Sequence, residues 1–209
     1  MTARPRARRK AERPGEILEA AFEEFSEKGF VAARLEDVAR RAGVTKGTIY
    51  VYFPTKEAVF LAMSEAFSKE MGARLAVFLA EAPKEEAALA EAALDYFYDL
   101  TADSRVGRML LLLIAEGGRF PEAADANFQR CLGPLLTRLQ EASGASESAA
   151  PLRAFPELLC APALLLLVWR RAFGGRRETE PQPHLEAAKK LILDGIRPRP
   201  RSGQPNSDP

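Results

Sequence analysis

The chain has 209 residues, of which 47% are hydrophobic and 28% are charged. This length suits one large or two small domains, and the hydrophobic fraction is sufficient for a buried core, which excludes a disordered chain. The net charge of +1 hides an uneven distribution. Residues 1–56 carry 12 Lys and Arg against 8 Asp and Glu, whereas residues 57–209 carry 18 against 21. The basic part of the protein is therefore its N-terminus.

Metal-binding and redox residues are sparse. Cys131 and Cys160 are far apart in sequence, form no C-x-x-C pair and are accompanied by one histidine, His184. This pattern predicts neither a disulfide framework nor a zinc site, and it suits a reducing compartment. We expect no metal and no cofactor.

No segment has the character of a targeting or membrane sequence. The basic start is interrupted by Glu12 and Glu16 before any apolar stretch of signal-peptide length begins. The most apolar run, residues 158–168, contains a proline and is well short of the roughly 20 residues that cross a bilayer. The expectation is a cytoplasmic protein without a membrane segment.

Hydrophobic residues recur with helical period along nearly the whole chain, and Gly and Pro residues separate the periodic stretches. This pattern predicts an all-α fold of about nine helices. The expected helices span residues 13–28, 35–42, 45–53, 55–82, 84–102, 105–117, 121–142, 152–173 and 184–196. Gly29 is the expected stop of the first helix.

The second and third expected helices form a helix-turn-helix after a longer supporting helix. Ala39 allows the two helices to approach closely, Gly43 makes the turn, and Val44 and Ile49 fill the space between them. In this motif the second helix enters the major groove of DNA.

The outward-facing residues of the third helix suit nucleic acid. Lysine, threonine and tyrosine bind phosphate oxygens, valine offers a methyl contact for thymine, and Gly47 lets the backbone come close. Thr45 and Thr55 are expected to cap their helices, and Lys56 lies where free N–H groups favour a phosphate. The predicted DNA-binding residues are Arg34, Thr45, Lys46, Gly47, Thr48, Tyr50, Val51, Tyr52 and Lys56. The basic residues between positions 4 and 10 can add contacts.

These features together resemble the TetR family of bacterial repressors. The resemblance covers about 50 residues and is carried by residues 17–25, Gly29, 35–42, 43–50 and 52–57. It implies a homodimer on a palindromic (inverted-repeat) operator of double-stranded DNA, with Tyr50, Tyr52 and Lys56 at phosphates and Lys46 and Thr48 near bases.

One position departs from the family pattern. Arg34 stands where the family usually has a capping Thr or Ser, so that cap is lost, although Glu36 and Asp37 still suit the helix dipole. We expect Arg34 to reach a phosphate instead.

The sequence pattern and the resemblance together predict the domain organisation. The expected parts are a basic flexible arm at 1–12, the helix-turn-helix domain at 13–57, a helical regulatory and dimerisation domain at 58–197 and a disordered tail at 198–209. The protein would be a repressor that a small, mostly apolar effector, bound among the fourth to eighth helices, releases from its operator.

Large side chains of the C-terminal part are candidates for lining the effector pocket. They are Phe67, Met71, Tyr96, Met109, Leu113, Phe128 and Trp169. The alternative is that they form the core, since such stripes at helical spacing pack inside more often than they line a pocket. Glu116 either orients a ligand or lies in solvent at a helix end.

The dimer interface is placed by the resemblance in residues 158–173 and 185–196, as a four-helix bundle. Two-fold symmetry makes such an interface self-complementary. The candidate residues are Leu164, Leu167, Leu185 and Leu191, together with Trp169.

Several plainer interpretations stand beside these. The three N-terminal helices can be a structural unit that binds no DNA, the basic arm can be a solvated terminus, and Tyr50 and Tyr52 can be packing residues, with Tyr50 the more buried. An interaction protein and an enzyme are the rival classes. The glycine pairs at 117–118 and 174–175 follow helices, so they indicate turns and not phosphate loops, and no catalytic constellation supports an enzyme.

Overall fold

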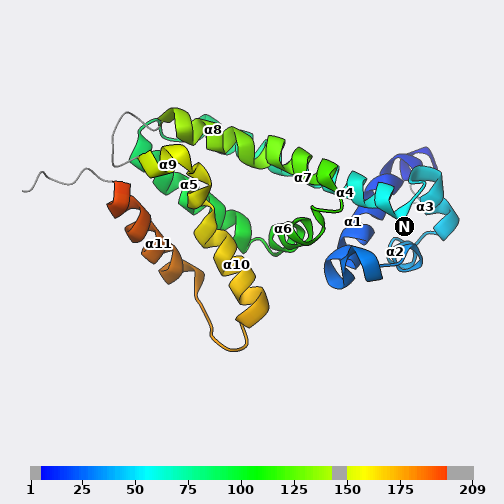
Figure 1. Ribbon diagram of the computed structural model, residues 1–209. Coiled ribbons are helices and arrows are strands. Elements are labelled where there is room, and N and C mark those ends of the chain that lie inside the picture. The colour runs from blue at the N-terminus through cyan, green and yellow to red at the C-terminus, as the bar shows by residue number, and fades with distance from the viewer. Residues whose placement is uncertain (1–5, 143–149, 197–209) are drawn as a thin grey trace, which may run out of the picture. The chain divides into compact units, whose positions relative to one another are not determined.

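The computed structural model describes residues 6–142 and 150–196, and every regular element within these ranges is helical (Figure 1). In chain order they are α1 (Arg6–Ala32), α2 (Leu35–Arg41), α3 (Lys46–Tyr52), α4 (Lys56–Glu81), α5 (Glu86–Ala102), α6 (Ser104–Glu116), α7 (Pro121–Asn127), the π-helical turn η1 (Phe128–Leu132), α8 (Gly133–Ala142), α9 (Ala150–Ala154), the 3-10 turn η2 (Pro156–Leu159), α10 (Ala161–Phe173) and α11 (Pro181–Ile196). The all-α prediction is confirmed.

The first helix is longer than the sequence pattern indicates. It begins at Arg6 instead of residue 13, so residues 6–12 of the expected flexible arm are helical. Pro14 lies inside it and removes one backbone donor. Gly29 has φ 74° and ψ 164°, which breaks the helix at the expected stop, and Phe30 to Ala32 continue beyond the break.

Two expected helices are divided in the structure. The stretch 121–142 is interrupted by η1, whose π-helical turn takes up an extra residue. The stretch 152–173 is interrupted because Pro156 and Pro162 each lie in the first turn of a new segment, η2 and α10. The expected loop at 143–150 falls almost wholly, and the expected tail at 198–209 entirely, outside the described residues.

Backbone contacts group the chain into two compact units. The first comprises Met1–Ala76 and Ser104–Gly133, and the second comprises Val77–Asp103 and Pro134–Pro209. The first unit is larger than the expected helix-turn-helix domain at 13–57, because α6 packs against α1. Among the described helices, none is both long and apolar enough to span a membrane.

Four aromatic rings form the centre of the first unit. Phe30 lies 5.6 Å from Phe25, 5.4 Å from Phe60 and 4.8 Å from Phe120 between ring centroids. Phe60 and Phe120 stack at 4.4 Å, and all four side chains are buried. Since Phe120 follows α6 and Phe60 belongs to α4, this cluster joins the end of α1 to both helices.

The second unit is organised around α5, against which α10, α11 and η2 pack (Figure 1). Burial raises the pKa of Tyr98 to about 12, so its hydroxyl stays protonated and can donate to His184 Nδ1 at 2.5 Å. Lys189 Nζ lies 2.7 Å from Asp95 Oδ1. These two polar contacts fix α11 along α5.

Phe120→Ala is expected to lower the free energy of unfolding by about 3–5 kcal/mol, because the change removes a buried ring and leaves a cavity. Phe128→Ala is the matched control, since that ring is 52% exposed, and it should change stability by less than about 0.5 kcal/mol. Urea denaturation followed by circular dichroism measures both. Equally small losses would contradict a central position for Phe120.

Candidate nucleic-acid interface

The turn between α2 and α3 has the geometry expected of a helix-turn-helix. Gly43 adopts φ 64°, a backbone conformation that residues other than glycine rarely take. The Val44 N–H donates to the Ala39 carbonyl at 2.9 Å. Ala39 and Ile49 are buried between the helices, as predicted, so the turn holds α3 in a fixed orientation to α2.

The N-terminal ends of α2, α3 and α4 follow the sequence prediction. Thr45 Oγ1 accepts from the Thr48 N–H at 3.1 Å, and Thr55 Oγ1 accepts from the Ala58 N–H at 3.0 Å. Arg34 occupies the N-cap position of α2 in an extended conformation and makes no side-chain cap. The predicted caps and the predicted loss of one cap are therefore confirmed.

The recognition helix α3 has one buried position and a broad exposed surface. Ile49 is fully buried, whereas Val51 is 76% exposed and Tyr50 is 45% exposed. Tyr52 is less exposed than Tyr50, so the expectation that Tyr50 is the more buried of the two is wrong. The reason is position: Tyr52 is the last residue of α3, and its ring centroid lies 6.5 Å from that of Phe53.

Lys46 is held by an acidic partner on α2. Its Nζ donates to Glu36 Oε1 at 2.5 Å and lies 5.6 Å from the centroid of the Tyr50 ring. The hydrogen bond from Lys46 lowers the pKa of Glu36, and the same bond raises the pKa of Lys46. Both side chains are exposed, so the pair lies open to solvent at the predicted DNA-binding surface.

Lys56 is placed differently from the expectation. Its Nζ donates to the carbonyls of Phe30, Val31 and Ala33 at 2.8, 3.3 and 3.0 Å, and it lies 4.5 Å from the Phe30 ring centroid. An ammonium has three protons, and here all three are directed at the end of α1. Lys56 thus caps α1 in this structure, and its predicted phosphate contact remains a prediction that requires one of these bonds to open.

A surface groove of about 360 Å³ lies beside the start of α4. Its lining residues are Leu35, Glu36, Lys46, Tyr50, Pro54, Thr55, Lys56 and Glu57. It brings together three residues predicted to bind DNA, together with the helix N-terminus that favours an anion. The other predicted residues, Arg34, Thr45, Gly47, Thr48, Val51 and Tyr52, do not line it.

The structure contains an ion-pair network between α1 and α2 that the sequence analysis did not predict. The carboxylate of Glu24 is fully buried; Arg41 Nε donates to its Oε2 at 3.1 Å, and Lys28 Nζ lies 2.6 Å from its Oε1. Arg41 also pairs with Glu27, and Lys28 with Asp37. The i, i+4 spacing of Glu24 and Lys28 was a visible signal, but the partners on α2 become neighbours only after folding.

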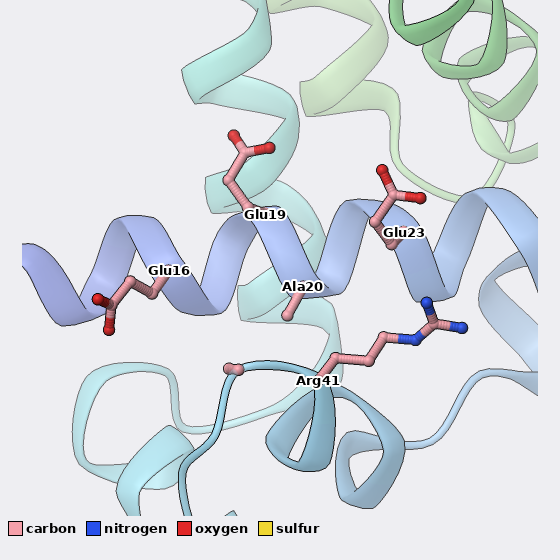
Figure 2. Close-up of a pocket in the computed structure, with 6 residues that line it drawn as sticks. Glu16, Glu19, Ala20, Glu23 and Arg41 are labelled. Atoms are coloured by element: carbon pink, nitrogen blue, oxygen red, sulfur yellow. The ribbon is translucent and has the colours of Figure 1, made fainter.

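Two arginines of α6 reach carboxylates of α1. Arg108 Nη1 and Nη2 donate to the two oxygens of Glu23 at 2.8 and 2.9 Å, which lowers the pKa of that carboxyl. Arg105 bridges Glu19 on α1 and Glu70 on α4 at 2.7 and 2.8 Å. Figure 2 shows Glu19 and Glu23 projecting from α1 beside a groove that Arg41 enters from the end of α2.

The residues predicted to line a pocket fall in both units. Of those in the first unit, Phe67, Met71, Met109 and Leu113 are buried and Phe128 is exposed. In the second unit Tyr96 is half-buried and stacks on Phe78 at 4.5 Å, and Trp169 is half-buried 5.0 Å from Phe173. Glu116 does not lie free in solvent at the helix end: its Oε1 accepts from the Phe30 N–H at 3.4 Å, and its Oε2 lies 3.4 Å from Arg119 Nε.

The residues predicted for a dimer interface differ in exposure. Leu191 is 79% exposed and Leu164 and Leu167 are half-buried, whereas Leu185 is buried in its own unit. Leu185 shares a face of α11 with Ala188, which is also buried, so it packs inside the chain and a partner contact through it is not supported. In residues 6–142 and 150–196 no group of His, Cys, Asp and Glu side chains could hold a metal ion.

The geometry of α1 to α3 is that of a helix-turn-helix DNA-binding protein. Residues 17–63 match the family model of bacterial regulatory proteins, tetR family. Over 197 residues, 93% of this chain and 97% of the relative, the chain is 27% identical to an uncharacterized HTH-type transcriptional regulator of Mycobacterium tuberculosis. Residues 17–63 thus carry a tetR-family helix-turn-helix domain, and nearly the whole chain is similar to HTH-type transcriptional regulators.

Solved structures agree with the fold. A TetR family transcription regulator from Marinobacter aquaeolei matches with a TM-score of 0.68 at 19% identity, over 90% of this chain and 97% of that chain. The transcriptional regulator FadR from Bacillus subtilis, solved in complex with stearoyl-CoA, matches with a TM-score of 0.59 at 16% identity, over 88% and 99%. At these identities the likeness concerns the fold alone.

Lys56→Met is expected to lower the free energy of unfolding by about 1–3 kcal/mol, because it leaves carbonyls at the end of α1 without their donor while keeping the apolar stem. Lys69→Met, a change at an exposed lysine of the same helix, is the control and should cost less than about 0.5 kcal/mol. Thermal denaturation without DNA measures both. Unchanged stability, with the salt dependence of DNA binding reduced by about 0.9 in slope, would instead make Lys56 a phosphate contact.

Proposed function

We propose that this regulator is a repressor that binds an inverted-repeat operator as a homodimer and leaves it when a small, mostly apolar molecule binds its helical part. The observation that carries the proposal is the attachment of α6 to α1 within one compact unit. Because α6 packs against α1, a shift of α6 would also move α1, the helix that supports the helix-turn-helix.

Exposed side chains of α3 support operator binding. Lys46, Gly47, Tyr50 and Val51 are all exposed, and α3 is oriented by the capped turn at Gly43. The resemblance to the TetR family implies that Tyr50 contacts a phosphate and that Lys46 lies near bases, and base contacts are the ones that carry sequence information.

Apolar exposure in the second unit supports a homodimer. On α10, Leu165 is 58% exposed, Val168 39% and Phe173 43%, and Leu191 projects from α11. Soluble monomers rarely leave several large apolar side chains of one helix in water, so such a surface favours a protein partner. A second copy of the chain meeting it about a two-fold axis would cover the same residues on both sides.

An apolar effector is supported by the size and composition of the helical part. Helices α4 to α11 exceed what a DNA-binding motif requires, and Phe67, Met71 and Met109 place large apolar groups in the interior of the first unit. FadR from Bacillus subtilis, which shares the fold, was solved with stearoyl-CoA. We propose a ligand of comparable apolar character for this chain.

Coupling between effector and operator is proposed to pass through Arg108. Its two hydrogen bonds to Glu23 form a fork that fixes the orientation as well as the distance of α6 to α1. Phe120, directly beyond α6, packs in the aromatic cluster with Phe30 and Phe60. Suppose that α6 can take two positions relative to α1, one that favours operator binding and one that does not. An effector with a higher affinity for one of these two states would then change the affinity of the protein for its operator.

The operator is expected to be an inverted repeat whose half-sites lie roughly 34–36 Å, or a multiple of this, apart. Sequences selected from random duplexes, followed by footprinting and analytical ultracentrifugation, measure symmetry and stoichiometry. Leu165→Glu should give a monomer with weak operator binding, whereas Val77→Glu, at an exposed residue of α4, should remain dimeric. Protection of a single half-site by a monomer would contradict the proposal, and failure to select any sequence would favour an interaction protein instead.

Effector binding should weaken operator binding by about 5- to 150-fold, and operator should weaken effector binding by the same factor. Calorimetric titration of hydrophobic candidates with and without operator measures the reciprocity. Arg108→Gln should keep effector affinity within about twofold and reduce the coupling, while Lys69→Gln, at an exposed lysine of α4, should keep the coupling. Full coupling in the Arg108 variant would show that the signal takes another route.

A further inference from the structure

Glu36 and Lys46 form an ion pair that joins α2 to α3. Glu36 belongs to the first turn of α2, Lys46 is the first residue of α3, and Lys46 Nζ donates to Glu36 Oε1 at 2.5 Å. The side chains are 58% and 44% exposed, and both line the groove beside the start of α4. A carboxylate therefore lies on the face of the helix-turn-helix that is predicted to meet DNA.

The fold of the helix-turn-helix does not depend on this pair. The turn at Gly43, the hydrogen bond of the Val44 N–H and the buried side chain of Ile49 already fix α3 against α2. Ion pairs between exposed side chains contribute little to stability. Arg41, by contrast, pairs with the fully buried carboxylate of Glu24 and joins α2 to α1. The pair at the groove is thus better explained by its effect on the charge of the lysine.

Glu36 cancels the charge of Lys46 at a distance and leaves hydrogen-bond donors in place. The hydrogen bond between them lowers the pKa of Glu36 and raises the pKa of Lys46, so both groups are ionised at neutral pH. Beyond a Debye length of about 8–10 Å, such a pair exerts almost no attraction on a phosphate. An ammonium has three protons, and Glu36 accepts one of them, so the others can bind an acceptor that comes into contact.

This difference between long range and contact separates nonspecific DNA from an operator. A free lysine binds the phosphates of any sequence, and this attraction carries no base information. A lysine held by a carboxylate gains little from a phosphate, because one anion only replaces another. An acceptor on a base edge, such as guanine O6 or N7, can still bind a remaining N–H of the positioned ammonium.

We propose that Glu36 is a positioning residue that raises sequence specificity, because it holds Lys46 in a neutral pair and so removes one attraction to nonspecific DNA. The inference rests on the proposed operator binding. It assigns a role in discrimination to a residue of α2 that need not contact a base itself. Among the described residues Glu57, a second carboxylate of the same groove, forms no ion pair with Lys46, and it provides a matched control.

The test compares the full-length protein with its Glu36→Gln variant on two duplexes of equal length, one selected from a random pool and one unselected. The variant should bind the unselected duplex about five- to tenfold more tightly, with a salt slope steeper by about 0.9, because one more phosphate is neutralised. Its affinity for the selected duplex should change by less than about twofold, so the ratio of the two affinities should fall. Fluorescence anisotropy at several salt concentrations measures both.

Two control variants separate the ion pair from the loss of a negative charge. Glu57→Gln removes the same charge from the groove and leaves the pair intact, so it should raise both affinities by the same factor. In a Lys46→Met background, Glu36→Gln should also change both affinities equally, because there is no ammonium to release. Thermal denaturation tests a structural role, and the midpoint of Glu36→Gln should lie within about 3 °C of wild type.

Equal gains on the two duplexes in the Glu36→Gln variant would overturn the inference. A larger loss of thermal stability with unchanged discrimination would overturn it as well, because the pair would then be structural. If the protein selects no sequence from the pool, operator binding itself has failed, and the inference fails with it. A selected sequence that Glu36→Gln discriminates as well as wild type refutes the role of Glu36 alone.

Discussion

The position of Phe30 controls how the DNA-binding part is attached to the helices that follow. Its ring contacts those of Phe60 and Phe120, its N–H donates to Glu116, and its carbonyl accepts from Lys56. The break at the preceding glycine turns the chain so that the Phe30 N–H reaches Glu116 of α6, while its ring and its carbonyl reach Phe60 and Lys56 of α4. Burial supplies most of the stabilisation, while the hydrogen bonds satisfy backbone groups that the end of α1 would otherwise leave unpaired.

The fold class and the local features of the helix-turn-helix could be predicted from sequence because their signals lie within a few residues. The turn glycine Gly43 and the cap Thr45 act on their immediate neighbours, so a string of residues is sufficient to identify them. Lys56 could not be assigned in this way, since its acceptors lie more than 20 positions earlier. The same limit applies to Leu185 and Leu191, because both are apolar and only packing against α5 decides which of them is buried.

Packing also changes the meaning of the basic N-terminal charge. Of the positive side chains in residues 1–56, Lys28, Arg40, Arg41 and Lys46 are paired with carboxylates, and Lys56 is bound to carbonyls. Lys28 and Arg41 are the most constrained, because both pair with Glu24, a fully buried carboxylate, and removal of a member of such a pair leaves an uncompensated charge. Lys28 and Arg41 therefore fix α1 against α2, so their charges serve the fold of the helix-turn-helix.

Lys46 and Lys56, the two lysines at the predicted DNA-binding surface, therefore differ in the partner that a DNA phosphate would have to replace. Lys46 is held by one exposed carboxylate, and exposed ion pairs contribute little to stability and are screened by salt, so DNA can take its ammonium at small cost. Lys56 is bound to three carbonyls. If its ammonium group moved to a phosphate, the carbonyls at the end of α1 would lose their donor. A backbone contact through Lys46 therefore leaves the support of α3 intact, whereas one through Lys56 would draw on the same bonds that hold α1 and α4 together. If Lys46 makes the phosphate contact, the protein gains the electrostatic attraction and keeps α3 rigidly supported. If Lys56 makes the contact, the attraction is gained by weakening that support.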